Sequence, residues 1–255
     1  MKFKDRIVLV TGSGRGIGSA AAKYFASEGA HIVINYVRNQ EDAEETAETV
    51  RSFGARALVV RANIGKMDGL EKLFAAVESA FSRLDIFISN AASGFNRPAL
   101  EQKPSGWDHT MNVNARAFLF GSQLAVPLME KAGGGHIVAV TSPGGDIVLP
   151  DYVAVGASKA ALNSLVRYLA VELAPRNIRV NAVSPGLVET EALKHFSHMR
   201  DSDVIPRTES LTPAGRIATP EDIAGVIGFL CSQEAEMIRG QIITADGGFT
   251  LKGQE

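Results

Sequence analysis

The sequence predicts a single-domain α/β fold with a doubly wound parallel sheet of about seven strands and helices on both faces. Three observations predict it. Short runs rich in β-branched residues alternate with segments of helical periodicity, and a glycine-rich turn joins the first run to the first helical segment. No linker, internal repeat or low-complexity stretch divides the 255 residues. Strands joined by right-handed, helix-length crossovers pair in parallel, and the crossovers cover both faces of the sheet.

The expected strands and helices alternate along most of the chain. Each strand range is a short run of mostly β-branched or aromatic side chains, and each helix range repeats apolar residues every three or four positions. Strands are expected at 7–11, 31–36, 57–61, 86–89, 137–141, 179–183 and 241–245, and helices at 16–28, 40–53, 67–82, 107–131, 152–173 and 221–231. The alternation stops at about 190–218, and a long insertion after a strand is typical of a substrate lid.

The composition excludes several classes of function. The chain is 45% hydrophobic and 21% charged with a net charge of −2, so we expect no surface for nucleic acid. No apolar run is long enough to span a membrane, and the first strand follows the N-terminus directly, so a cytoplasmic protein is expected. The single cysteine, Cys231, lies in an apolar run, which predicts a buried thiol. His195 and His198 have no third clustered ligand, so no metal site is expected.

The sequence TGSGRGIG at residues 11–18 has the setting of a dinucleotide-binding turn. It follows the first expected strand and opens the first expected helix. Glycines allow the backbone to turn tightly and approach a pyrophosphate, while the free N–H groups of the helix N-terminus bind its charge. The residues expected to bind the cofactor here are Gly12, Ser13, Gly14, Arg15, Gly16, Ile17 and Gly18.

The end of the second strand predicts which dinucleotide is bound. An NAD-binding chain would place a carboxylate there to hold the ribose 2′-hydroxyl, but residues 35–39 read NYVRN. Arg38, assisted by Arg15, suits the 2′-phosphate of NADPH, because a guanidinium pairs two phosphate oxygens at once. The alternative is that Arg38 is a solvated loop charge. Since ligands bind at the carboxyl ends of parallel strands, the cofactor-binding set extends to Tyr36, Asn63, Ile64, Asn90, Ala91 and Ala92.

Several motifs together resemble a known family. The chain follows the order and spacing of the short-chain dehydrogenase/reductases over nearly its whole length, at TGSGRGIG, NAA (90–92), Asn114, Ser142, Lys159 and Pro185-Gly186. It is similar to the type III enoyl-acyl-carrier-protein reductases of bacteria at NAASGFNRP (90–98), residues 152–175, EALKHF (191–196), LTPAGR (211–216) and MIRGQIITADGG (237–248). This resemblance implies a Rossmann-like fold and a homotetramer. It also implies NADPH-dependent reduction of trans-2-enoyl thioesters, carried by acyl carrier protein or CoA, in fatty-acid biosynthesis.

The position of Tyr152 departs from the usual pattern of this family. The family usually keeps a tyrosine four residues before the lysine, but that position is Val155, and Tyr152 lies seven residues before Lys159. With Asp151 expected to cap the helix that Tyr152 opens, both positions fall near the face of Lys159, and the tyrosine is moved by about 4.5 Å along the axis. A ketone takes hydride at the carbon that bears its oxygen, whereas an enoyl thioester takes hydride at C3 and develops charge on the oxygen at C1. The retracted tyrosine therefore favours reduction of a carbon–carbon double bond.

The expected catalytic group consists of Tyr152, Lys159, Asn114 and Ser142. Tyr152 would donate a hydrogen bond to the enolate oxygen, and Lys159 would hold the nicotinamide ribose and lower the pKa of the tyrosine. The resemblance implies that Asn114 supports the lysine through water, and the alternative is a buried amide bonded to backbone. Ser142 is either catalytic or a turn cap, since a hydroxyl at a strand end can do both.

The remaining site residues are expected in two loops. The resemblance implies that the loop after the sixth strand contacts the nicotinamide and the phosphates through Pro185, Gly186, Val188 and Thr190. The side chains expected to line an acyl channel beside Tyr152 are Phe95, Leu193 and Phe196, and ordinary packing is the alternative.

Other functions stay open on the sequence. Within the family these are a ketone or hydroxysteroid reductase, a 3-oxoacyl thioester reductase and a dienoyl-thioester reductase. Val155 argues against a ketone reductase, because it has no proton to donate. In another class, the alternative is a non-catalytic NADP-binding sensor, against which the presence of Lys159, Asn114 and Ser142 argues.

Overall fold

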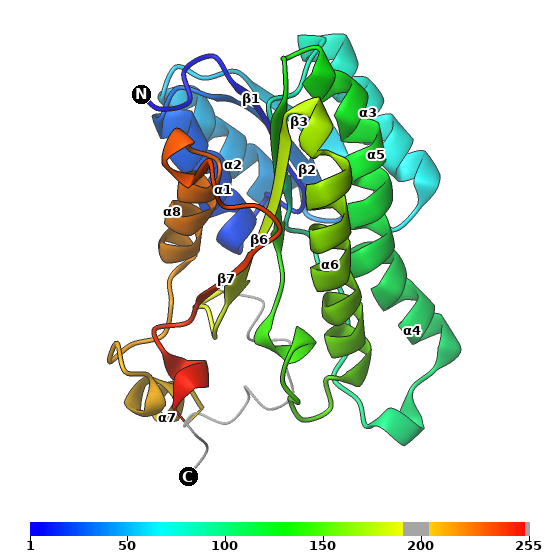
Figure 1. Cartoon of the computed structure of the whole chain (residues 1–255), viewed down its shortest axis with the longest axis vertical. Coiled ribbons are helices and arrows are strands. Elements are labelled where there is room, and N and C mark those ends of the chain that lie inside the picture. The colour runs from blue at the N-terminus through cyan, green and yellow to red at the C-terminus, as the bar shows by residue number, and fades with distance from the viewer. Residues whose placement is uncertain (191–203, 253–255) are drawn as a thin grey trace.

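The computed structural model describes residues 1–190 and 204–252, and one parallel sheet forms its centre (Figure 1). Within these residues, seven strands pair in the order β3-β2-β1-β4-β5-β6-β7, and each pair is parallel. The strands are β1 Ile7–Val10, β2 His31–Tyr36, β3 Ala57–Arg61, β4 Ile86–Ser89, β5 Gly135–Val140, β6 Ile178–Pro185 and β7 Ile242–Ala245. The predicted doubly wound sheet is confirmed.

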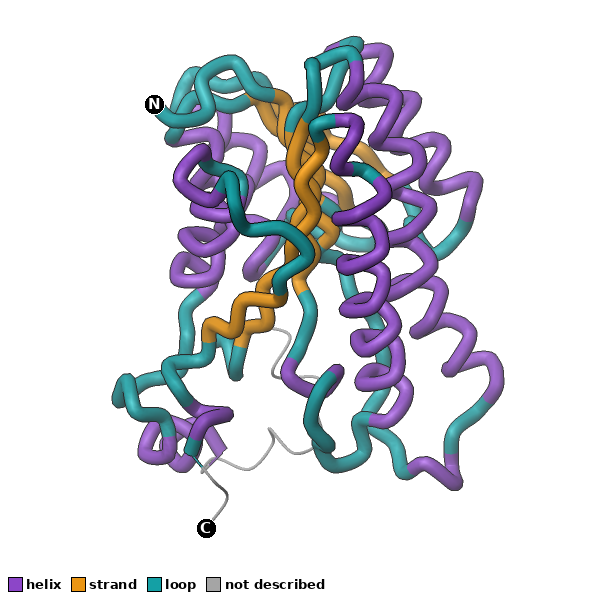
Figure 2. Tube along the Cα trace, in the orientation of Figure 1, coloured by secondary structure: helices purple, strands orange, loops and turns teal. Residues whose placement is uncertain are grey.

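Helices cover both faces of this sheet. They are α1 Gly16–Ser27, α2 Gln40–Ser52, α3 Met67–Phe81, α4 Pro104–Met111, α5 Ala117–Glu130, α6 Val153–Glu172, α7 Val204–Leu211 and α8 Pro220–Leu230. Figures 1 and 2 show α1, α2 and α8 on one face, and α3, α5 and α6 on the other. Because strand side chains alternate between faces, Leu9 packs in a cluster with Phe118 of α5, whereas Val8 packs in a cluster with Phe25 of α1.

Three local features differ from the predicted elements. The helix predicted at 107–131 begins earlier, as α4, and a π-helical turn, Asn112–Arg116, interrupts it before α5. α7 falls inside the stretch 190–218, where the regular alternation of strands and helices is predicted to stop. Tyr152 is itself the N-cap of α6 and Asp151 has a φ of 56°, so the prediction that Asp151 caps the helix is wrong. A cap usually needs extended backbone, which the left-handed Asp151 does not have.

The strand order brings two of the predicted cofactor segments together. β1 pairs with β2 on one side and with β4 on the other, so the chain winds outward in both directions from this point. Doubly wound folds bind ligands at the carboxyl ends of strands where the winding reverses. The glycine-rich turn follows β1 and the segment 90–98 follows β4, so both segments meet at this reversal.

The two ends of the segment between β6 and α8 lie side by side. Val188 and Ala218 form a parallel bridge, in which Glu189 N donates to the Ala218 carbonyl oxygen at 3.0 Å and Ala218 N donates to the Leu187 carbonyl oxygen at 3.2 Å. Both ends of the predicted lid are therefore fixed beside the carboxyl end of β6.

The thiol of Cys231 is buried at the end of α8, which confirms the prediction, and burial raises its pKa. Among the helices of the described residues, none has both the length and the apolar character needed to cross a membrane.

Candidate active site

Two asparagines hold the glycine-rich turn from neighbouring strands. The Asn90 amide, just after β4, donates to the carbonyl oxygens of Thr11 at 2.9 Å and Gly12 at 3.1 Å. Asn35 in β2 is fully buried, its Oδ1 accepts from the Gly12 N–H at 3.2 Å, and its backbone exchanges hydrogen bonds with Ser13. These contacts fix the turn before any ligand binds. A role for Asn35 is not predicted from the sequence, and its only signal is an amide at a position that the strand buries.

The glycines of the turn form a cradle that side chains would fill. A Cβ at Gly18 would lie 2.5 Å from the Gly12 carbonyl oxygen and 2.6 Å from the Asn90 amide nitrogen. A Cβ at Gly16 would meet the methyl group of Thr190, so the loop after β6 reaches the turn. α1 begins without a side-chain cap, which leaves its first N–H groups available to an anion. The residues present therefore fit the pyrophosphate of a dinucleotide.

Substituting Gly18 with alanine is expected to weaken dinucleotide binding by about tenfold or more, because the added methyl group would push α1 away from the turn and misalign N–H groups that bind a charged phosphate. Fluorescence titration with NADPH measures the effect. Gly106→Ala is the control, since a Cβ there would meet no atom within 4 Å. Wild-type affinity in Gly18→Ala would show that the cradle does not hold the pyrophosphate.

The predicted 2′-phosphate residues, Arg15 and Arg38, are exposed near the ends of β1 and β2. A hollow of about 420 Å³ lies at the ends of β2 and β3. It is lined by Val37, Arg61, Ala62, Asn63, Lys66, Asp68, Gly69 and Lys72. Arg61 Nε donates to the Val37 carbonyl oxygen at 3.2 Å and so holds the backbone next to Arg38. Three of the four charged residues that line the hollow are basic, which suits a phosphate group.

Two predicted cofactor residues direct their side chains into the core. Ile64 belongs to the buried cluster that includes α3, and Val188 to the one that includes α8. Contact of these two residues with a cofactor therefore stays a prediction for their backbone groups alone. The other predicted positions lie in or beside the loops that follow β1, β2, β4 and β6, at Gly14, Ile17, Tyr36, Ala91, Ala92, Pro185 and Gly186.

Tyr152 and Ser142 meet at the start of α6. The Tyr152 Oη donates to the Ser142 Oγ at 3.4 Å, and the same oxygen accepts from the Gly144 N–H at 3.3 Å. Burial raises the pKa of the Tyr152 phenol, and the hydrogen bond with Ser142 opposes this rise. The turn-cap alternative for Ser142 is therefore confirmed, while its catalytic role stays a prediction.

Lys159 lies buried behind this pair. Its side chain is 4% exposed, and its Nζ donates to the Val140 carbonyl oxygen at the end of β5 at 2.8 Å. Burial lowers its pKa to about 8. Tyr152 and Lys159 share no direct hydrogen bond in the described structure, so the ammonium would act on the phenol through space or through a bound ligand.

Asn114 lies in the π-helical turn and binds the loop after β4. Its Nδ2 donates to the Ser93 carbonyl oxygen and to the Ser158 Oγ, both at 2.9 Å, and its Oδ1 accepts from the Ser93 N–H at 2.9 Å. The side chain thus matches the alternative of a buried amide bonded to backbone. Support of Lys159 through water stays a prediction, and both amide N–H groups of Asn114 already have partners.

Position 155 is filled by apolar packing. Val155 is 6% exposed, and a Cβ at Gly94 would lie 2.2 Å from its Cγ2, so the valine lies against the loop after β4. Four residues before Lys159 the structure therefore has a hydrocarbon contact and no proton donor. Phe95, next to Gly94, is 66% exposed. The other two predicted acyl-channel residues, Leu193 and Phe196, lie outside the described residues.

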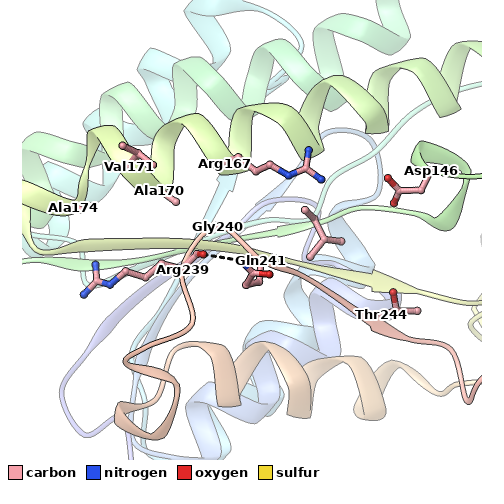
Figure 3. Close-up of a pocket in the computed structure, with 10 residues that line it drawn as sticks. Asp146, Arg167, Ala170, Val171, Ala174, Arg239, Gly240, Gln241 and Thr244 are labelled. Carbon is pink, nitrogen blue, oxygen red and sulfur yellow. Dashed lines mark hydrogen bonds between the residues drawn. The ribbon is translucent and has the colours of Figure 1, made fainter.

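A second hollow, of about 710 Å³, lies between α6 and the edge strand β7 (Figure 3). Arg167, Ala170 and Val171 of α6 line it on one side, and Gln241 with the strand that follows lines the other. Its lining includes neither Tyr152 nor Lys159. This hollow is therefore separate from the predicted catalytic group.

Comparisons with a family model, with curated proteins and with solved structures point to one family. A family model described as Enoyl-(Acyl carrier protein) reductase matches residues 12–250. The chain is 36% identical to 1-cyclohexenylcarbonyl-CoA reductase of Streptomyces collinus, over 97% of this chain and 88% of that protein. A 7α-hydroxysteroid dehydrogenase complexed with NADH and 7-oxo glycochenodeoxycholic acid is 33% identical, with a TM-score of 0.89 over 97% of this chain and 95% of that one. The chain belongs to the short-chain dehydrogenase/reductase family.

As a short-chain dehydrogenase/reductase, the chain is an oxidoreductase of a family that uses NAD(P)(H). The glycine cradle and the uncapped start of α1 agree with this use. A further solved relative, the angucycline C-6 ketoreductase LanV with bound NADP, is 32% identical with a TM-score of 0.89 over 98% of this chain and 97% of that one. The solved relatives of this chain thus include one with NADH and one with NADP. The choice between NADH and NADPH therefore rests on the residues of this chain.

Proposed function

We propose that this short-chain dehydrogenase/reductase uses NADPH to reduce the carbon–carbon double bond of trans-2-enoyl thioesters. The observation that carries the proposal is the place of the phenol. Tyr152 stands at the N-cap of α6 against Ser142, while Val155 fills the position four residues before Lys159. The family description supports the proposal, as does the Streptomyces collinus relative, whose named substrate carries a double bond conjugated to a thioester.

The polar groups at the start of α6 suit the charge that this reaction develops. Bound NADPH would supply a hydride to the substrate. Tyr152 Oη would donate a hydrogen bond to the thioester oxygen as that oxygen gains negative charge. When the single phenolic proton is donated to the thioester oxygen, the Ser142 Oγ still accepts from the Gly144 N–H, and the proton of Ser142 is available for a second hydrogen bond to the thioester oxygen. The ammonium of Lys159 favours ionisation of the phenol and therefore its transfer of a proton.

The preference for NADPH is proposed from Arg38 and Arg15. Both guanidinium groups are exposed where a 2′-phosphate would lie, and residues 35–39 contain no carboxylate that would repel it. The alternative, in which Arg38 is only solvated, predicts equal use of NADH.

Replacing Arg38 with alanine is expected to raise the KM for NADPH by about tenfold or more, since hydrogen bonds to a charged group contribute ~1.5–3 kcal/mol, and to leave the KM for NADH unchanged. Steady-state kinetics with both dinucleotides measures the change. Arg176→Ala is the matched control. Arg176 pairs with Glu130 at 2.6 Å and lies next to the start of β6, whereas Arg38 follows the carboxyl end of β2. Equal changes for NADPH and NADH in Arg38→Ala would contradict the assignment.

The likeness to enoyl-acyl-carrier-protein reductases supports several further proposals. The thioester would be carried by acyl carrier protein or CoA, and the process served would be fatty-acid biosynthesis. A homotetramer in the cytoplasm is proposed on the same ground, with Phe95, Leu193 and Phe196 along the acyl chain.

Ketone reduction is the second candidate, because the 7α-hydroxysteroid dehydrogenase and LanV carry names of enzymes that act at an oxygen-bearing carbon. The absence of a proton donor at Val155 weighs against it. The test offers a trans-2-enoyl thioester and a 3-oxoacyl thioester in parallel and follows NADPH absorbance. Faster oxidation with the enoyl substrate supports the proposal. Faster oxidation with the 3-oxo substrate would replace it with ketone reduction.

A further inference from the structure

We propose that Gly144 is a positioning residue that sets where the Tyr152 phenol stands. Gly144 lies in the turn Pro143–Gly145 between β5 and α6. A Cβ on Gly144 would lie 2.6 Å from both Cδ1 and Cε1 of Tyr152. The ring therefore lies directly on the bare backbone of this turn, at a distance that no other residue type allows.

A second glycine holds the turn against the helix. A Cβ on Gly156, in the first turn of α6, would lie 2.6 Å from the Gly144 carbonyl oxygen. The turn and the helix thus approach at backbone distance beside the ring. Gly145 continues the contact, since a Cβ there would lie 3.1 Å from the backbone of Lys159 and Ala160.

This close approach determines the hydrogen bond of the phenol. Ser142 begins the same turn, and its Oγ is held by the Gly144 N–H at 3.3 Å. The Tyr152 Oη reaches that oxygen at 3.4 Å, near the upper limit for a hydrogen bond, so little displacement of the ring is tolerated. A side chain at position 144 would lift the ring from the turn and separate the two hydroxyls. Gly144 thereby acts on the reaction through Tyr152 without touching the substrate.

The kinetic test of this inference rests on the proposed function. Gly144→Ala is expected to lower kcat for a trans-2-enoyl thioester by about 10- to 100-fold, as a misplacement of about 1 Å does, with the Kd for NADPH unchanged. Gly225→Ala in α8 is the matched control, because a Cβ there would meet no atom within 4 Å. Wild-type kcat in Gly144→Ala would overturn the inference.

A thermal stability cycle tests the same contact without any substrate. Gly144→Ala, Tyr152→Ala and the double variant are compared by Tm. If the added methyl group conflicts with the ring, the Tm loss caused by Gly144→Ala is much smaller when residue 152 is alanine, and the double variant folds even where the single variant does not. An equal loss in both backgrounds would overturn the inference. Because this cycle needs no turnover, it still decides the role of Gly144 if the enoyl assay fails.

Discussion

Replacing Tyr152 with phenylalanine is expected to lower kcat for a trans-2-enoyl thioester by about 10²–10³-fold, the effect of removing one preorganised donor to a developing oxyanion. The substitution removes only the hydroxyl that meets Ser142 at 3.4 Å and keeps the ring that packs on the turn before α6. NADPH affinity and Tm are expected to stay unchanged. Steady-state kinetics, NADPH titration and a thermal melt measure the three quantities.

Tyr168→Phe is the matched control for this substitution. Tyr168 lies on the same helix, its side chain is 66% exposed, and loss of its hydroxyl is expected to have no effect. Turnover by Tyr152→Phe at the wild-type rate, with NADPH still bound, would show that another group stabilises the thioester oxygen. Loss of NADPH binding would instead assign the hydroxyl to the cofactor.

Replacing Lys159 with methionine is expected to lower kcat/KM by about 10²-fold or more, because the ammonium supports proton transfer from the phenol. Methionine keeps the volume and the apolar stem of the side chain while it removes the charge. Wild-type activity is expected to fall as pH rises through about 8, where the buried lysine loses its proton. A pH–rate profile that stays flat through this range would contradict the need for a charged lysine.

The lowered pKa of Lys159 also predicts how the free energy of unfolding depends on pH. Burial lowers the folded pKa of Lys159 from 10.5 to about 8, so between these values the unfolded chain binds the extra proton and the folded chain does not. Unfolding in this window takes up a proton, and the free energy of unfolding therefore rises with pH across it. Below about pH 8 both states hold the proton and this dependence vanishes. Denaturant unfolding at pH 7.5 and 9.5 should show a rise in the wild type that Lys159→Met lacks.

The sheet and its order of elements are predictable because they depend on periodicity. The apolar run IVLV at β1 and the apolar repeat of α3 indicate which residues are buried. Most ends of strands and helices lie within two residues of the predicted positions. The π-helical turn is not predictable, since one extra residue within a long stretch of helical periodicity leaves no separate signal in the sequence. The predicted N-cap of α6 fails for a related reason, because Asp151 is a favoured cap residue but has left-handed backbone here.

The site is predictable where chemistry depends on residue type, and unpredictable where it depends on contact. Tyr152 and Ser142 are predicted from their types and spacing, and the structure places their hydroxyls together. Ile64 and Val188 are predicted from loop position alone, and their side chains pack in the core. Gly144 is missed, because a glycine after a proline is typical of an ordinary turn until the ring of Tyr152 is seen against it.

The π-helical turn joins α4 and α5 into one long helix and rotates the side chains of one half about the axis relative to those of the other half. Each residue turns an α-helix by about 100°, so one added residue rotates the residues before it by that angle relative to the residues after it. Asn114 thereby faces Ser93 in the loop after β4, while Phe118 a few residues later stays fully buried against the sheet. A deletion of one residue at 112–116 would make the helix more regular and yet turn one of these side chains away from its partner. The irregular turn lets a single helix serve both the core and the site.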